Sequence, residues 1–359
     1  MFIDFTKAFD TIDHEILLHK LSVYGVNGVT LELFRSYLLN RRQIVTLGTA
    51  SSTVKIINTG VPQGSILGPF LFLVYINDLP KILVHADAVL YADDTNLLLS
   101  GKDMLELYTK MNNDLALLFK WCQNNKLRPN SSKTSYILFH SPQKRVLTPP
   151  TLYLNNHPIM RRDCATFLGV ILDKHLKFSA HINKVVRKMA SASSILVKSR
   201  FSFPLNVLVQ IYYAFIHPHL TYCIEVWGTT YQTYLLPLVR AQKRAIRIMT
   251  FSSSQTPSKP LFNHCGIMIF QTLLKYKVLL NMFRIVNNAP KDSYTVHLST
   301  HSSSRLHNSG GLILPMARTN YGQQTLLFKG SVYWNELPSE VRKCTSFSFF
   351  LRRLRDLLT

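Results

Sequence analysis

Two adjacent aspartates, Asp93 and Asp94, lie between apolar runs in the stretch Ala88-Val-Leu-Tyr-Ala-Asp-Asp-Thr-Asn-Leu-Leu-Leu99. Neighbouring carboxylates repel each other, so the pair is costly unless a cation lies close to it. Apolar runs on both sides of a short polar segment are typical of a tight β-hairpin with acidic residues at its tip. A plain surface turn would also explain one such pair, because aspartate is common in turns.

A third carboxylate and a glycine-containing loop favour a metal-binding interpretation. Asp4 follows the apolar run Met1-Phe-Ile, which indicates the end of a strand. The loop Val61-Pro-Gln-Gly-Ser-Ile-Leu-Gly-Pro69 precedes a predicted buried helix over 66–77. Three carboxylates on neighbouring strand ends can hold two Mg²⁺ ions about 3.5–4 Å apart. We therefore expect the three carboxylates to lie close together and, without cations, at least one of them to have a raised pKa.

The elements around these residues predict an α+β fold in the first half of the chain and helices in the second. The predicted elements are helices at 14–24, 31–39, after Met104, and at 178–199, 205–216, 234–250 and 266–288, with strands at Tyr136–His140, Leu152–Leu154 and Phe167–Leu172. Residues 252–260 have the composition of a linker, and 297–311 that of a Ser/His-rich loop.

Positive charge is concentrated in the second half of the chain. The 359 residues include 41 Lys/Arg and 19 Asp/Glu, a formal net charge of +22, and residues 176–359 hold 23 of the former and 5 of the latter. Such a surface favours a polyanion, with nucleic acid first and an anionic membrane second. Four basic residues lie on one side of the predicted helix 234–250: Arg240, Lys243, Arg244 and Arg247. They form either a phosphate-binding face or an ordinary solvated one.

Several other classes of protein are disfavoured. The five cysteines are scattered and odd in number, which argues against a disulfide framework and against zinc-finger spacing. The longest charge-free runs contain prolines and polar residues, so we expect buried core and no membrane span. No targeting signal is visible, and we expect an intracellular protein without a disulfide partner.

Five ordered motifs resemble those of reverse transcriptases of non-LTR (LINE-type) retrotransposons. They are Phe2-Ile-Asp-Phe-Thr-Lys-Ala-Phe-Asp-Thr-Ile-Asp-His14, Val61–Pro69, Tyr91-Ala-Asp-Asp94, Trp121–Thr134 and Phe167-Leu-Gly-Val-Ile-Leu-Asp173. The basic region and the tail around Tyr333-Trp-Asn-Glu-Leu-Pro338 also resemble the C-terminal parts of such elements. A match to the tetrapeptide Tyr91–Asp94 alone would be weak evidence for the family, but five matching motifs in the same order are specific evidence.

The resemblance implies a role for each matching position. Asp4, Asp93 and Asp94 would be catalytic metal ligands for two Mg²⁺ (with Mn²⁺ as a substitute), and the Phe5 carbonyl would complete one metal shell. Phe9 would lie under the sugar of the incoming dNTP and exclude a 2′-hydroxyl. Further positions would bind nucleotide (Gln63, Gly64, Lys133), the primer end (Phe167, Leu168, Gly169) and nucleic acid (Arg240, Lys243, Arg244, Arg247).

Plainer interpretations of these positions stay open. Phe9 could be ordinary core, Gln63 could cap the following helix, and Lys133 could be one more solvated lysine. Asp10 and Asp13 we interpret as capping residues near the helix at 14–24, not as metal ligands.

The resemblance also predicts an organisation: a polymerase right-hand palm at 1–175, with an antiparallel sheet and helices on one face, a basic helical thumb-like region at 176–250, and a C-terminal retroelement region at 251–359. RNA template, DNA primer and dNTP would be the partners, in nuclear and cytoplasmic ribonucleoprotein. The chain begins at the first palm motif, without the fingers and endonuclease of family members, so we expect a fragment. Such a fragment could be an active polymerase, a catalytically dead remnant that binds only nucleic acid through its basic half, or an unstable product without function.

Overall fold

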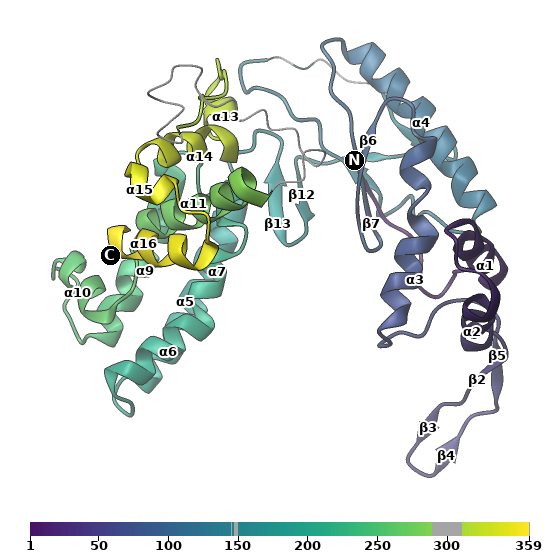
Figure 1. Ribbon diagram of the computed structural model, residues 1–359, viewed down its shortest axis with the longest axis horizontal. Helices are drawn as coiled ribbons and strands as arrows, with labels where there is room; N and C mark the ends of the chain where they lie inside the picture. Colours follow the sequence, from purple (N-terminus) through teal and green to yellow (C-terminus); the bar gives the residue numbers. More distant parts are fainter. Residues whose placement is uncertain (145, 147–149, 289–310, 359) are drawn as a thin grey trace. The chain divides into compact units, whose positions relative to one another are not determined.

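The computed structural model describes residues 1–144, 146, 150–288 and 311–358. The chain divides into two compact units, Met1–Ala165 and Thr166–Thr359, and each is described here by itself. Figure 1 labels the elements along the chain. The expected boundaries at residues 175/176 and 250/251 stay predictions.

The first unit mixes short strands with helices. Its helices are α1 (His14–Val23), α2 (Gly28–Leu38), α3 (Leu67–Ile76), the 3₁₀ helix η1 (Leu79–Ile82) and α4 (Met104–Asn124). Its strands are β1 (Phe2–Ile3), β2 (Arg41–Gln43), β3 (Thr46–Leu47), β4 (Ala50–Ser51), β5 (Lys55–Ile57), β6 (Asp87–Tyr91), β7 (Asp94–Leu98), β8 (Ser135–Tyr136), β9 (Tyr153–Leu154), β10 (His157–Pro158) and β11 (Met160–Arg161). The helices predicted at 14–24 and 66–77 and the one after Met104 are thereby confirmed.

One five-stranded sheet, in the order β11-β8-β1-β7-β6, forms the centre of this unit. Its pairs are antiparallel except β8 with β11, which is parallel. The expected all-antiparallel sheet is therefore wrong at this edge, because the β9–β10 hairpin turns the chain so that β11 enters in the direction of β8. The strand predicted over Tyr136–His140 is also too long: only its first residue lies in a strand.

The core of the first unit joins β1 to three helices. Its apolar residues include Ile3 and Phe5, Leu17 of α1, Phe72 of α3 and Leu115 of α4. Asp114, buried on α4, accepts backbone hydrogen bonds from Val84, His85 and Ala86, directly before β6. These contacts fix the start of the β6–β7 hairpin, and the tip of the hairpin carries the aspartate pair.

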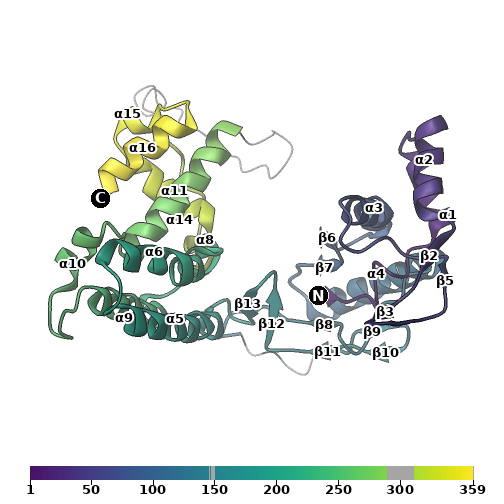
Figure 2. The ribbon, with the colours of Figure 1, turned by 90° about the horizontal axis from the view of Figure 1, so that it is seen from below.

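The second unit is helical apart from one hairpin, of which β12 (Cys164–Phe167) begins at its boundary and β13 (Val170–Asp173) follows. Its helices are α5 (Ser179–Ser199), α6 (Leu205–Phe215), α7 (His217–Thr221), α8 (Ile224–Trp227), α9 (Gln232–Met249), α10 (Ser258–Cys265), α11 (Phe270–Asn288), α13 (Asn320–Gln323), α14 (Leu326–Asn335), α15 (Ser339–Arg342) and α16 (Phe347–Leu358). Helices α5 and α9 pack along each other (Figure 2) and share one core with α11, α14 and α16.

Two sequence expectations change in this unit. The linker expected at 252–260 ends early because α10 already begins at Ser258, and the helix expected from 266 begins at Phe270 because Gly266, at φ +63°, ends α10. The loop expected at 297–311 lies, except for residue 311, outside the described residues. Among the described helices, none is long and apolar enough to cross a membrane, and none of the five cysteines, all of which are described, forms a disulfide bond.

Candidate active site

The register of β1 against β7 places two of the three predicted carboxylates opposite each other. Phe2 pairs with Asn96 and Ile3 with Thr95, so one further step sets Asp4 opposite Asp94. Met1 and Leu97 exchange both backbone hydrogen bonds, at 2.7 and 3.0 Å. Because hydrogen-bonded and non-hydrogen-bonded pairs alternate, Asp4 and Asp94 fall at a non-hydrogen-bonded position, where facing side chains come closest.

The third carboxylate lies in the turn that joins β6 to β7. Tyr91 pairs with Asp94, which leaves only Ala92 and Asp93 in the connection. Ala92 adopts a positive φ of 51°, as a two-residue hairpin turn demands. The hairpin predicted from the two apolar runs is confirmed, with Asp93 exposed at its tip.

The electrostatics of the group are those of crowded anions. Partial burial raises the pKa of Asp94 above its usual value, and the negative charges of Asp93 and Asp4 raise it further. Lys133 lies beside the group, with its Nζ 3.9 Å from Oδ2 of Asp4, but its side chain is 71% exposed. This loose, solvated contact compensates the cluster weakly.

The loop that carries Lys133 also fixes the backbone of Asp4. The Asp4 carbonyl accepts a hydrogen bond from Asn130 at 2.7 Å, and its N–H donates to Oγ1 of the buried Thr134 at 3.4 Å. Next to it, the buried Phe5 bridges to Pro129. Sequence reasoning missed Asn130 and Thr134, because their role lies in backbone contacts across more than 120 positions.

A second group surrounds the loop at 60–64. Val61 donates to the carbonyl of Phe9 at 3.0 Å, and Gln63 Nε2 donates to Oδ1 of Asp10 at 2.8 Å. Gly60, at φ +83°, lies so close that a Cβ there would meet the Asp10 Cα at 2.8 Å. The loop is therefore bound to the segment that follows Asp4.

These contacts decide between some of the plainer interpretations. Gln63 does not cap α3, since the hydroxyl of Ser65 accepts from Gly68 instead. Asp10 is no cap either, because it binds Gln63, whereas Asp13 does cap α1 by accepting from Ile16 at 3.0 Å. The half-buried Phe9 ring packs on Phe72 at 4.5 Å, so a core role and a role toward the sugar remain compatible.

The donor set can be tested for metal binding. Among the described side chains, no group of three or more His, Cys, Asp or Glu is gathered closely enough to hold an ion as they stand. The chemistry nonetheless fits a hard divalent cation, because carboxylate oxygens are the ligands that Mg²⁺ prefers and the negative charges of Asp93 and Asp4 help to raise the pKa of Asp94. Exposed side chains at Asp93 and Asp94 can rotate toward a cation without disturbing the core.

The motif Phe167-Leu-Gly169 belongs to the second unit and forms the turn between β12 and β13. Leu168 and Gly169 both have positive φ, at 43° and 83°. The Tyr222 hydroxyl donates to the Leu168 carbonyl at 2.6 Å, and a Cβ on Gly169 would approach the Tyr222 ring at 3.2 Å. Tyr222 thus supports the turn, a contact with no signal in the sequence.

The four basic residues of α9 divide into two kinds. Arg240 and Arg244 are exposed and line a groove between α5 and α9 together with Lys198. Lys243 is half-buried. Arg247 is committed to the fold, since its Nε and Nη2 both donate to the Thr256 carbonyl, at 3.1 and 2.9 Å.

Comparison with known proteins identifies a family for the first part of the chain and relatives for a longer stretch of it. The reverse transcriptase (RNA-dependent DNA polymerase) family matches residues 1–172. The RNA-directed DNA polymerase from mobile element jockey of Drosophila melanogaster is 30% identical over 256 residues, which cover 68% of this chain and 28% of that protein. The probable RNA-directed DNA polymerase from transposon X-element of the same species is 27% identical over 257 residues, covering 70% and 28%.

A more distant relative belongs to another element. The Pol polyprotein from the type-1 retrotransposable element R1 of Bradysia coprophila is 28% identical over 183 residues, which are 50% of this chain and 18% of that protein. The chain thus spans less than a third of the length of these relatives. Through residues 1–172, it belongs to the reverse transcriptases of non-LTR retrotransposons.

Proposed function

We propose that this chain carries the catalytic site of an RNA-directed DNA polymerase, which adds dNTP to a primer 3′-hydroxyl on an RNA template. The observation that carries the proposal is the facing pair Asp4 and Asp94, at a non-hydrogen-bonded position of the sheet with Asp93 in the adjoining turn. Facing anions destabilise a sheet. Two facing carboxylates at one strand end are stabilised if a cation binds between them.

The carboxylates would hold two Mg²⁺ ions, or Mn²⁺ in their place, with the Phe5 carbonyl as a further ligand. Bound there, the ions supply activation of the attacking hydroxyl and neutralise the departing pyrophosphate. Asp4 and Asp94 orient the site because the sheet register fixes their backbones, and Asn130 fixes Asp4 further through its carbonyl. Lys133, which is solvated and near Asp4, can move to the leaving pyrophosphate and donate a proton there.

The nucleotide would bind beside the loop at 60–64. Gln63 and Gly64 are exposed and held next to the segment of Phe9 by the Gln63–Asp10 hydrogen bond. The Phe9 ring, supported by Phe72, would then form a rigid surface against the sugar. A ring held in this way leaves no space for a 2′-hydroxyl and selects dNTP over rNTP.

The second unit would supply the grip on nucleic acid within a right-hand polymerase arrangement. The Phe167-Leu-Gly169 turn, stiffened by Tyr222, would contact the primer end. Arg240 and Arg244, with Lys198 across the groove, would bind the phosphate backbone. We assign Arg247 to stability instead, because its guanidinium is already used by Thr256.

Primer extension on an RNA template tests the catalytic proposal. The assay uses two forms: the wild-type chain, and the chain fused to the segment that precedes the matched region in the jockey polymerase. At least the fused form should extend a DNA primer with Mg²⁺ and dNTP. Asp93→Asn should lower the rate by about 10²–10³-fold, a loss comparable to removing one group that stabilises transition-state charge. Asp87→Asn, on the exposed start of β6, is the matched control and should change little. Equal activity in Asp93→Asn and wild type would exclude the proposed site.

A second function is favoured by the groove between α5 and α9, whose arginines have no carboxylate partner among the described residues. A chain that extends no primer but binds single-stranded RNA through this groove would be a nucleic-acid-binding remnant. Binding that persists in Asp93→Asn and is lost in Arg240→Ala/Arg244→Ala would separate the two functions.

A further inference from the structure

Two exposed phenylalanine rings lie against each other in the second unit, where α5 and α9 end. Phe201 follows α5 and Phe251 follows α9, and their ring centroids are 5.4 Å apart in an edge-to-face arrangement. Phe201 is 75% exposed and Phe251 56%, and neither belongs to the core of this unit. A contiguous apolar surface of this kind is a feature that needs an explanation, unlike a single exposed side chain.

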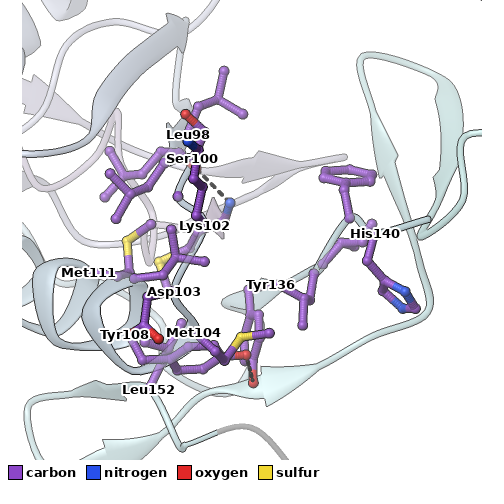
Figure 3. Close-up of a pocket in the computed structure, with 18 of the residues that line it drawn as sticks. Leu98, Ser100, Lys102, Asp103, Met104, Tyr108, Met111, Tyr136, His140 and Leu152 are labelled. Atoms are coloured by element: carbon purple, nitrogen blue, oxygen red, sulfur yellow. Dashed lines mark hydrogen bonds between the residues drawn. The ribbon is translucent and has the colours of Figure 1, made fainter. Parts of the chain in front are cut away.

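An aromatic pair of the first unit shows the ordinary case. In the pocket that Figure 3 shows, Tyr108 and Tyr136 are both buried, with ring centroids 5.9 Å apart, and the Tyr108 hydroxyl donates to the Tyr136 hydroxyl at 3.2 Å. Such a pair is stabilised by burial and by its hydrogen bond. The pair of Phe201 and Phe251 is left largely in water and has no polar group, so packing does not explain its position.

The backbone at Phe251 is one that ordinarily carries glycine. Thr250 caps α9, and the N–H groups of Phe251 and Ser252 donate to the carbonyls of Ile248 and Arg247, at 3.5 and 3.0 Å. Helices that end with these two bonds place a left-handed residue after the cap, and Phe251 has a φ of +54°. A bulky side chain is disfavoured in that conformation. The sequence thus places a large ring at an exposed position against the preference of the backbone, which points to a use of the ring itself.

Arg200 lies over both rings and has no anionic partner. Its Cζ is 4.6 Å from the Phe201 centroid and 5.2 Å from the Phe251 centroid. Among the described residues, no carboxylate pairs with it, and its buried Nε has no hydrogen-bond partner. Contact with the two rings holds the guanidinium in place without neutralising it. A fixed positive group beside exposed aromatic faces matches a ligand that has both a flat ring and an anion.

The rings lie at one end of the basic groove between α5 and α9. Lys198, Arg240 and Arg244 line this groove. Arg240, Arg244 and Ile248 are spaced four residues apart and share one face of α9, and Phe251 comes three residues later. At 1.5 Å per residue, Arg244 and Phe251 are about 10 Å apart along the helix axis. A single strand with its phosphates on the two arginines therefore reaches the rings within a few nucleotides.

We propose that Phe201 and Phe251 form a stacking platform for an unpaired base of a single-stranded nucleic acid, and that Arg200 binds the phosphate beside that base. The inference rests on the proposed binding of a phosphate backbone in the groove, and it adds a position for a base. Every base has a flat face, so stacking requires no particular sequence. A duplex cannot use the platform because its bases are already stacked, and the second unit therefore prefers single strands.

The test compares two probes that differ only in their bases. One is a fluorescein-labelled DNA single strand of about twelve thymidines, within the range of single-strand binding sites. The other has the same length and phosphates but abasic sugars throughout. Fluorescence anisotropy titrations with the full chain give both affinities. Stacking contributes to the first probe alone, so the wild-type chain should bind it about tenfold or more tightly than the second.

Substitutions at Phe201 show whether the preference comes from stacking. Phe201→Ala should weaken binding of the thymidine probe about tenfold and leave the abasic probe within about twofold of wild type. Phe201→Tyr keeps an aromatic face and should bind as wild type does, whereas Phe201→Leu keeps only apolar bulk and should resemble Phe201→Ala. Phe349→Ala is the matched control, because Phe349 is also exposed and has Arg353 over its ring at 5.2 Å, but it lies on α16 and does not line the groove.

A glycine variant separates loss of the ring from loss of the fold. Phe251→Gly removes the ring and supplies the residue that is favoured at this helix end. Its urea midpoint should therefore equal or exceed that of the wild-type chain. Its preference for the thymidine probe should nevertheless be reduced, as in Phe201→Ala.

The outcomes distinguish the platform from the groove. Equal affinity of the wild-type chain for the two probes, a preference that Phe201→Ala and Phe251→Gly retain, or an equal loss in Phe349→Ala would overturn the platform. Arg240→Ala/Arg244→Ala should weaken both probes alike. If it binds as wild type does while the phenylalanine variants lose the preference, the assignment of the groove fails and the platform stands. A wild-type chain that binds neither probe would overturn both.

Discussion

The two units differ in which of their charges are compensated. In the first unit, Asp13 and Asp78 each lie 2.6–2.7 Å from a lysine, while Asp93 and Asp94 make no ion pair with any described residue. In the second unit, Lys275 binds Glu336 at 2.6 Å and Arg247 binds Thr256, while Arg240 and Arg244 are left open to solvent. Each unit therefore has structural charges that are paired and a second set that is not.

This contrast teaches how to separate binding charges from structural ones in a very basic chain. Total charge does not do so, because most of the 41 basic residues are simply solvated. A charged group that the backbone holds in place without an ion-pair partner does mark a binding charge, because its position is fixed while its electrostatic partner is absent. This criterion agrees with our proposal that the first unit binds cations and the second a polyanion.

The largest effect that would sharpen the comparison concerns nucleotide choice in the first unit. In whichever form of the chain extends a primer, Phe9→Ala should improve incorporation of rNTP relative to dNTP by roughly 10–100-fold, because the ring no longer excludes the 2′-hydroxyl. Single-nucleotide incorporation kinetics measure the ratio. Phe119→Ala, another half-buried phenylalanine of the same core, is the control. If both variants keep the wild-type ratio, Phe9 is only a core residue.

The next effect tests the polyanion side. Arg240→Ala/Arg244→Ala should reduce the slope of log K against log salt for single-stranded RNA by about 1.4, which is about 0.7 for each lost phosphate contact. Anisotropy titrations at several salt concentrations give the slope. Lys259→Ala/Arg352→Ala removes the same charge from exposed positions of the same unit and should leave it nearly unchanged. Equal losses in the two double variants would mean that only net charge matters.

A stability measurement separates the two kinds of arginine. Arg247→Ala should lower the free energy of unfolding by about 1.5–3 kcal/mol, since it removes charged hydrogen bonds to the Thr256 carbonyl. Arg240→Ala should change it by less than about 0.5 kcal/mol, as exposed substitutions usually do. Urea unfolding followed by circular dichroism compares them. A reversed order would contradict the division of α9 into structural and binding residues.

The smallest expected effect concerns the anionic site itself. The raised pKa of Asp94 means that the folded chain binds its proton more tightly than the unfolded chain, so stability falls as pH rises through the folded-state pKa. Asp94→Asn should therefore be more stable than wild type at pH 7, by up to about 1 kcal/mol, and the difference should close as pH falls below the unfolded value.

Magnesium should make the wild-type chain more stable than Asp94→Asn, because the ion offsets the repulsion only where the carboxylates are present. Thermal unfolding at pH 4 and pH 7, with and without Mg²⁺, measures both effects. A wild-type chain that is the more stable one at pH 7 without Mg²⁺ would show that the facing carboxylates are not strained.

Local pattern was sufficient to predict the parts of the fold in which neighbours in sequence decide the structure. Apolar runs on both sides of Asp93 predicted the hairpin, and helical periodicity predicted the long helix α4 and the bounds of α9 to within two residues. Asp4 could be connected to Asp93 and Asp94 only through the order of motifs, since a two-residue strand carries almost no signal of its own. The register that sets it opposite Asp94 required the structure.

The misses have one physical cause, which is dependence on a distant or absent partner. Asp10 binds Gln63, 53 positions away, and could not be distinguished from a capping residue by its neighbours. Residues 137–139 have strand-like composition, but none of the described strands pairs with them. Arg247 looked like its neighbours on α9 until the path of the chain brought the Thr256 carbonyl to it.

The position of β1 in the middle of its sheet has a consequence for the order in which the chain folds. Residues 1–3 are synthesised before the rest of the first unit, yet Met1 bonds to Leu97, 96 positions later, and Asp4 to Thr134, 130 positions later. Closing such long loops is entropically costly and slow. Helices α1 to α4 and the β6–β7 hairpin can form from local contacts while β1 waits for both neighbours. The three carboxylates therefore come together only at the end of synthesis of the first unit, and a nascent chain cannot trap cations there early.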